Sequence, residues 1–199
     1  ISLLCFSCAK NTQIEVYRFS YGTMDEDTLP ISGWVAPTRY LNCNTLEQYK
    51  ILKESGLTSI YSLYEKYGVK SRDQNNEIYD GTEEVYKALE YSTEVGIKYF
   101  VSDPYLWNLE GEAFKEAFES RHYTDYDSFA GFFYSDEPRD QEAFNKIRKS
   151  YDKFKQYVPQ KYAFYVNLNP IELFTNNYGT VDDYKKLTIS AESDEALLK

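Results

Sequence analysis

Short apolar segments alternate with amphipathic segments along most of this chain. Five segments rich in aromatic and β-branched residues have the length of strands, and they lie at residues 31–39, 57–65, 97–104, 129–138 and 162–170. The first four are each followed by a segment with helical spacing of its apolar residues, at 44–56, 81–96, 111–120 and 140–158. Such β-α alternation is typical of a parallel sheet whose strands are joined by crossover helices.

The strand midpoints recur at a nearly constant interval, because they fall near residues 34, 61, 99, 132 and 165. A period of this length predicts an α/β fold of the (β/α)₈ TIM-barrel type, in which eight units take about 250 residues. With 199 residues, we expect a barrel truncated to about its first five βα units, forming one domain over 30–199. The alternative is a complete five-stranded, doubly wound sheet of the flavodoxin type.

The first 29 residues predict a leader rather than a part of the barrel. The chain begins "ISLLCFSCAKNTQ", an apolar run that changes at once to a polar stretch, as at the end of a secretory signal. Cys8 stands where a bacterial lipoprotein would be lipidated. We therefore expect a secreted or cell-surface protein, with Cys8 as the candidate site of a lipid anchor in the bacterial envelope. The other interpretation of this run is a buried first strand.

Charge and composition narrow the classes of partner and cofactor. The chain carries 22 basic and 32 acidic residues, for a net charge of −10, which disfavours nucleic acid and anionic membrane surfaces. A single histidine, His122, argues against a histidine-based zinc site and a Ser-His-Asp triad. No glycine-rich phosphate loop follows the first strand. We expect no metal and no cofactor, and contact with a membrane only through a lipid anchor.

Polar side chains end four consecutive predicted strands. Glu65 ends the second strand, Asp103 the third, Asp136 and Glu137 the fourth, and Asn167 the fifth. In both candidate architectures, function gathers at the carboxyl ends of the strands. The chain also has 21 tyrosines, whose rings combine an apolar body with a polar tip. The sequence therefore predicts an acidic, aromatic-walled cleft that suits a carbohydrate.

The stretch "FFYSDEP" ends the fourth predicted strand and allows two interpretations. A pair of carboxyl groups is what glycoside hydrolysis needs, since one protonates the leaving oxygen and the other acts as nucleophile or base. The competing interpretation is a helix start, with Asp136 as the N-cap and Pro138 as an early helical residue.

The same stretch resembles the Asn-Glu-Pro signature of the large retaining clan of (β/α)₈ glycoside hydrolases. Together with "PISGWVAPTR", "YKILKESGLTSIYSLYE" and "YVNLNP", in order at βα spacing, it is similar to secreted glycoside-hydrolase-like proteins of gut bacteria. The resemblance covers residues 30 to 183. It implies that Glu137 is the general acid/base and that the nucleophile follows a seventh strand, beyond this fragment.

The resemblance also assigns substrate-binding positions. Asp136, Glu65, Asp103 and Asn167 would line the sugar subsites, and Trp34 would pack under or beside the cleft. Asp136 stands where the clan has an asparagine, and an ionised Asp accepts hydrogen bonds but donates none. The second hypothesis for function is therefore a carbohydrate-binding or surface-interaction protein that uses the same scaffold without catalysis.

Overall fold

The computed structural model describes residues 30–170 and residue 180. The described residues do not include the predicted leader with its proposed lipidation site Cys8. They also do not include the residues beyond 170, apart from Thr180.

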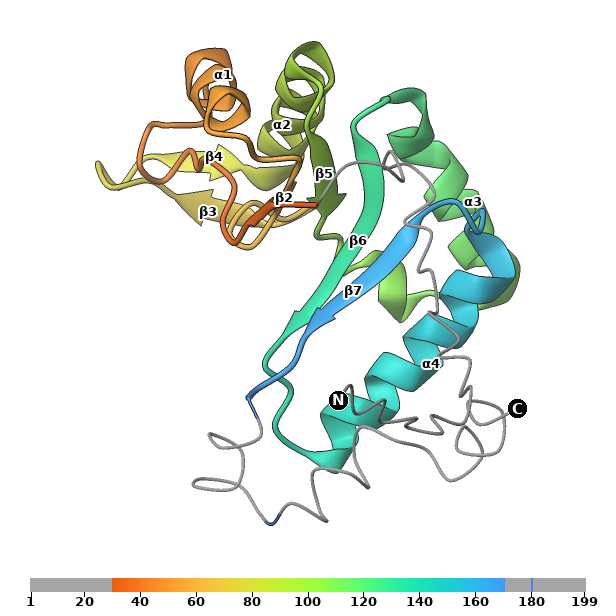
Figure 1. The fold of residues 1–199 in the computed structure, drawn as a ribbon. Helices are drawn as coiled ribbons and strands as arrows, with labels where there is room; N and C mark the ends of the chain where they lie inside the picture. The colour runs from red at the N-terminus through yellow and green to blue at the C-terminus, as the bar shows by residue number, and fades with distance from the viewer. Residues whose placement is uncertain (1–29, 171–179, 181–199) are drawn as a thin grey trace, which may run out of the picture.

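Five strands form a parallel sheet in the order of the sequence, β1-β2-β5-β6-β7. Their bounds are β1 Ser32–Gly33, β2 Ser59–Tyr61, β5 Lys98–Val101, β6 Phe129–Asp136 and β7 Ala163–Asn167. A doubly wound sheet reverses its strand order at one point, and this sheet does not. The flavodoxin alternative therefore does not describe this part of the chain (Figure 1).

The sheet curls by 195° into a half-barrel. Divided among the four steps between five strands, this curl amounts to about 49° per step, and eight steps of about 45° close a circle. The curvature therefore agrees with a partial TIM-like barrel, as the periodicity predicts.

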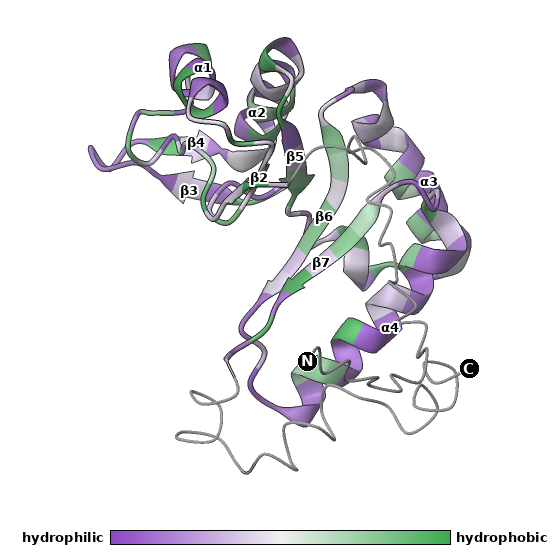
Figure 2. Ribbon diagram, viewed as in Figure 1, coloured by the Kyte–Doolittle hydropathy of each residue, from purple (hydrophilic) through white to green (hydrophobic). Residues whose placement is uncertain are grey.

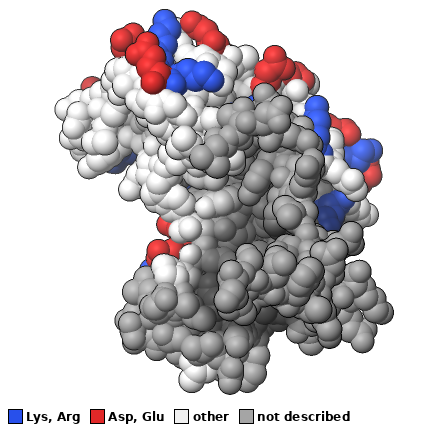
Figure 3. All heavy atoms as spheres, in the orientation of Figure 1, with Lys and Arg blue, Asp and Glu red and all other residues white. Residues whose placement is uncertain are grey.

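Four α-helices follow strands of the sheet as the sequence indicates. Their bounds are α1 Leu46–Glu54, α2 Gly81–Val95, α3 Gly111–Ser120 and α4 Gln141–Tyr157. They surround one face of the curved sheet (Figure 1), because right-handed crossovers between sequential neighbours place every helix on the same side. Each helix is hydrophobic toward the sheet and hydrophilic outward (Figure 2). Acidic and basic side chains intermingle over the outer helices (Figure 3).

Residues 66–80, between the second predicted strand and the second predicted helix, contain a small second sheet. Strands β3 Lys70–Arg72 and β4 Ile78–Asp80 pair antiparallel. Asp80 then caps α2, since its Oδ1 accepts a hydrogen bond from the Thr82 backbone N–H at 2.8 Å. The sequence predicts no strand in this segment, because Lys70 and Arg72 are exposed and the apolar alternation that indicates a strand is absent.

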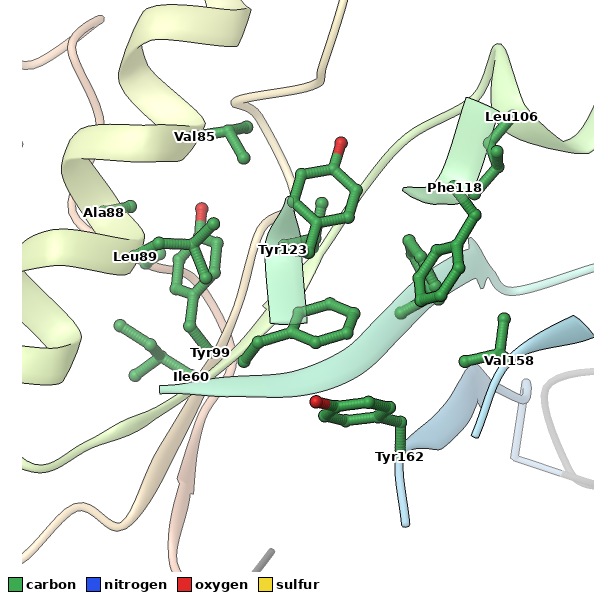
Figure 4. Packing of buried hydrophobic residues seen from close by; sticks show 14 of the residues in the cluster. Ile60, Val85, Ala88, Leu89, Tyr99, Leu106, Phe118, Tyr123, Val158 and Tyr162 are labelled. Carbon is green, nitrogen blue, oxygen red and sulfur yellow. The ribbon is translucent and has the colours of Figure 1, made fainter. Parts of the chain in front are cut away.

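The main core lies between the sheet and the helices. Tyr99 and Phe132 from the strands meet Leu89 of α2, Phe118 of α3 and Val158, which follows α4, and all are nearly inaccessible to solvent (Figure 4). Burial of such side chains contributes about 1.5–3 kcal/mol each.

The inner, concave face is filled by one aromatic ring from each of β2, β5, β6 and β7 and by Trp34, and we call these five rings the aromatic layer. Tyr61 lies at its centre: its ring centroid is 4.9 Å from that of Phe100, 5.9 Å from Phe133 and 4.4 Å from Tyr165. Trp34, directly after β1, lies 6.1 Å from Tyr61 and 5.8 Å from Phe133. Because β2 and β7 are not neighbours in the sheet, the Tyr61–Tyr165 stack depends on the curl.

A β-bulge in β6 changes which side chains of this strand point to each face of the sheet. Tyr99 pairs with Phe129 and Phe100 pairs with Gly131, which leaves Ala130 as the extra residue. The extra residue shifts the alternation of side chains, so that Phe129 and Phe132 both join the outer core, whereas Ala130 and Phe133 face the inner side. Gly131 has φ +131°, and a Cβ there would lie 1.9 Å from the Ala163 carbonyl oxygen of β7.

We expect Gly131→Ala to destabilise the fold severely, because the new methyl group would push β7 away from β6. Gly56→Ala is the matched control, since Gly56 has φ +87° but open space around its Cβ position. The control should lose about 1–2 kcal/mol through the left-handed backbone alone, and Gly131→Ala at least about 2 kcal/mol more. Urea denaturation measures both, and equal losses would contradict the close approach of the two strands.

Candidate functional site

The stretch from Asp136 to Pro138 is not a helix start. Strand β6 continues through Asp136, and α4 begins only at Gln141. The N-cap of α4 is Asp140, whose Oδ1 accepts from the Ala143 backbone N–H at 2.8 Å. The interpretation of Asp136 as N-cap was wrong, because a better-placed aspartate four residues later takes that role. Helix capping therefore does not account for Asp136 or Glu137.

Glu137 adopts a backbone conformation that is uncommon for its residue type. Its φ is +46°, in the left-handed region that residues other than glycine enter at a cost. Its backbone N–H donates to the Asn167 carbonyl oxygen of β7 at 2.8 Å, which fixes the turn at the sheet edge. The side chain is 36% exposed, and its Oε2 lies 3.8 Å from Nη2 of Arg139.

Asp136 and Asn167 meet at the carboxyl ends of β6 and β7. Asn167 Nδ2 donates to Asp136 Oδ1 at 2.9 Å, and the two residues are paired in the strand register. The amide therefore satisfies one carboxylate oxygen of Asp136 and sets its direction beside Glu137. Three of the predicted site residues, Asp136, Glu137 and Asn167, come together in this way.

The aromatic layer lies just below this edge. Tyr165 precedes Asn167 by two residues and Phe133 precedes Asp136 by three, which corresponds to about 7–10 Å along a strand. Trp34 is 40% exposed, whereas Phe133 and Tyr61 are almost wholly buried. The layer therefore offers an accessible indole on a rigid aromatic base.

Asp103 lies at the end of β5 but faces into the protein. Its Oδ1 accepts from the Leu106 backbone N–H at 3.0 Å, and its Oδ2 accepts from Arg121 Nε at 3.1 Å and the Tyr123 hydroxyl at 3.0 Å. The Arg121 guanidinium in turn covers the Tyr67 ring at 4.1 Å. Since Asp103 is 1% exposed, its carboxylate organises the loop after β5.

Glu65 is buried as well, at 2% exposure. Its Oε1 accepts from the Arg39 backbone N–H at 2.7 Å, so the carboxyl group ties the loop after β1 to the end of β2. Burial raises the pKa of Glu65, although the hydrogen bond from Arg39 and the nearby Tyr79 hydroxyl oppose this. Burial and the nearby Glu65 charge raise the pKa of Tyr79 to about 12.

The structure thus divides the predicted site residues into two groups. Asp136, Glu137 and Asn167 form one cluster at the β6–β7 end, with Trp34 exposed on the aromatic layer. Glu65 and Asp103 bind the protein's own backbone and side chains, and their contact with a sugar stays a prediction.

Sequence reasoning missed Arg139 and the aromatic layer. Arg139 gave no signal apart from its place two residues after Glu137. The alternation of side chains along a strand could have indicated Tyr61, Phe100 and Tyr165. It could not have indicated Phe133, because the bulge in β6 breaks the alternation before this residue.

The described residues, 30–170 and 180, contain no group of three or more His, Cys, Asp or Glu that could hold a metal ion. Within the same residues, no helix combines the length and apolarity needed to cross a bilayer. The free thiol of Cys43 is partly exposed.

Comparison with known proteins identifies no relative. No family model, curated protein or solved structure matches this chain.

We expect Glu65→Gln to stabilise the protein increasingly as pH rises. Because the pKa of Glu65 is higher in the folded protein than in the unfolded chain, its ionisation disfavours folding. The free energy of unfolding of the wild type therefore falls as the pH rises from the ordinary pKa of a glutamate to the raised one. Glutamine keeps the oxygen that accepts from Arg39 and removes the charge. Urea denaturation at about pH 4 and about pH 8 should show a larger advantage at the higher pH. Glu90→Gln, exposed on α2, is the control, and a pH-independent difference for Glu65→Gln would contradict the account.

Proposed function

We propose that this chain is the first part of a glycoside hydrolase and that Glu137 is its general acid/base. The observation that carries the proposal is the strained turn at Glu137, with φ +46° at the carboxyl end of the fourth strand of a half-barrel. Strained non-glycine residues persist where the surrounding structure fixes them, and they cluster at active sites. The carboxyl end of a barrel strand is also where catalytic residues of this architecture lie.

The arrangement around Glu137 suits proton transfer to a glycosidic oxygen. Its backbone is held by Asn167, and its side chain is 36% exposed, so the carboxyl group can reach a ligand above the sheet edge. A general acid must lie within about 2.6–3.2 Å of the oxygen that it protonates. Asp136, oriented by Asn167, would accept a hydrogen bond from a sugar hydroxyl.

Hydrolysis requires a second carboxyl group. The resemblance assigns it to a seventh strand of the completed barrel. Its separation from Glu137 would decide the stereochemical outcome, because about 5–5.5 Å favours retention and about 6.5–9.5 Å favours inversion.

A carbohydrate-binding protein without catalysis is the second candidate. The exposed Trp34 ring favours it, since an accessible indole on a fixed base provides an apolar platform with a polar edge. The same surface would serve either function.

Replacing Glu137 with Gln in the full-length protein should lower glycan hydrolysis by about 10²–10⁴-fold, the usual contribution of a general acid, and leave glycan binding intact. The matched control is Glu116→Gln, on the exposed face of α3, which should hydrolyse at the wild-type rate. Unchanged turnover by Glu137→Gln would remove the assignment. Glycan binding without any product from the wild-type protein would favour the second candidate.

A further inference from the structure

A polar cavity lies on the helical side of the sheet, next to the carboxyl end of β6. It has a volume of about 440 Å³ and lies between α4, the end of β6 and the loop after β5. We call it the lysine pocket, after Lys146, Lys149 and Lys153 of α4, which line it together with Glu110, Ser135 and Ser150.

The lysine pocket is positive in an otherwise acidic protein. Its lining residues include three lysines and one carboxylate, Glu110, which is an excess of two positive charges. Lys146 also pairs with Glu142, which lies outside the lining. The whole chain, in contrast, has a net charge of −10. The spacing of 146, 149 and 153 places the three ammonium groups on one face of α4. Such a local reversal of sign attracts an anion against the average field of the molecule.

The three lysines are not equivalent. Lys153 is 9% exposed and donates to the Trp107 and Leu109 carbonyl oxygens at 2.5 and 2.9 Å, with Glu110 at 3.4 Å. It therefore fixes the pocket wall and adds charge. Lys149 is 77% exposed and lies 3.8 Å from Glu110, and Lys146 is 66% exposed and pairs with Glu142. Exposed ion pairs are weak, so these two ammonium groups can turn to a ligand at little cost.

The pocket also adjoins the candidate catalytic edge. Ser135 lines it and precedes Glu137 by two residues, which limits their separation along the chain to about 7 Å. The hydroxyl groups of Ser135 and Ser150 add neutral polar contacts of the kind that a sugar ring uses.

We propose that the lysine pocket binds the anionic group of an acidic saccharide, a carboxylate or a sulfate, while the glycan extends toward Glu137. This inference rests on the proposed function, because it names the substrate class of that site. Lys146 and Lys149 contact the anion, and Lys153 positions the wall of the pocket.

Calorimetric titration of the protein with glucuronate, glucose 6-sulfate and glucose tests the proposal. At least one of the two anionic sugars should bind about tenfold or more tightly than glucose, with an affinity that falls as salt increases. Tighter binding of glucuronate would indicate a uronic acid substrate, and tighter binding of the sulfate a sulfated one. Equal binding of all three sugars would overturn the proposal.

A variant with both Lys146→Gln and Lys149→Gln should lose about tenfold in affinity for the preferred anion and keep its affinity for glucose. Lys70→Gln, exposed on β3, is the matched control and should bind like the wild type. Unfolding by urea checks that the double variant is folded, and undiminished anion binding by the folded variant would overturn the assignment.

The two proposals fail separately. Glu137→Gln should bind the anionic sugar as the wild type does, because Glu137 does not line the lysine pocket. Loss of hydrolysis in Glu137→Gln together with equal binding of neutral and anionic sugars would refute the pocket and leave the proposed function standing. Tight anion binding together with normal turnover in Glu137→Gln would refute the proposed role of Glu137 and leave the lysine pocket standing.

Discussion

Tyr61 contacts four other rings, which are Trp34 directly after β1 and one ring each from β5, β6 and β7. Aromatic pairs at such separations contribute about 0.5–1.5 kcal/mol each beyond their buried area. Because the partners come from strands up to three positions away in the sheet, all these contacts can form only if the sheet is curled. The aromatic layer therefore requires the 195° curl of the sheet. The curl in turn sets the position of every strand end.

The site follows from this constraint through β6. The bulge at Ala130 and Gly131 lets Phe129 and Phe132 pack on the helices while Phe133 enters the aromatic layer. Beyond Phe133, the strand pairs with β7 as far as Asp136 and Asn167. The turn at Glu137 is then held by a backbone hydrogen bond to the same neighbour. The carboxyl group of Glu137, whose backbone is strained, thus lies at the end of a strand that the aromatic layer holds in place.

Local signals in the sequence were sufficient for the helices. The segment predicted at 81–96 is helix α2, which ends one residue earlier, and the segment predicted at 140–158 is helix α4, which is one residue shorter at each end. Helices are predictable in this way because capping residues and apolar stripes act within a few turns. The β3–β4 hairpin gave no such signal. Lys70 and Arg72 are exposed, so the apolar alternation that reveals a strand is absent there.

The site was harder to predict than the fold for a physical reason. A carboxylate at the end of a strand can face a ligand, as Glu137 does in our proposal, or accept hydrogen bonds from the protein, as Glu65 and Asp103 do. Both situations produce the same residue in the same place in the sequence. The difference lies in long-range packing, since Arg39 and Tyr123 are distant in sequence from the carboxylates that they meet. The prediction of Asp136 as the cap of α4 failed for a similar reason, because only strand pairing with β7 decides where β6 ends.

The most direct test of the central claim is the coupling between Tyr61 and Tyr165, whose rings stack at 4.4 Å across the concave face. A double-mutant cycle with Tyr61→Ala and Tyr165→Ala, measured by urea denaturation, isolates their interaction free energy. The curled sheet predicts a favourable coupling of about 0.5–1.5 kcal/mol, whereas Tyr61 and Tyr126, which belong to different clusters, should be additive. Additivity of Tyr61 and Tyr165 would mean that the rings do not meet, and it would contradict the half-barrel on which the site depends.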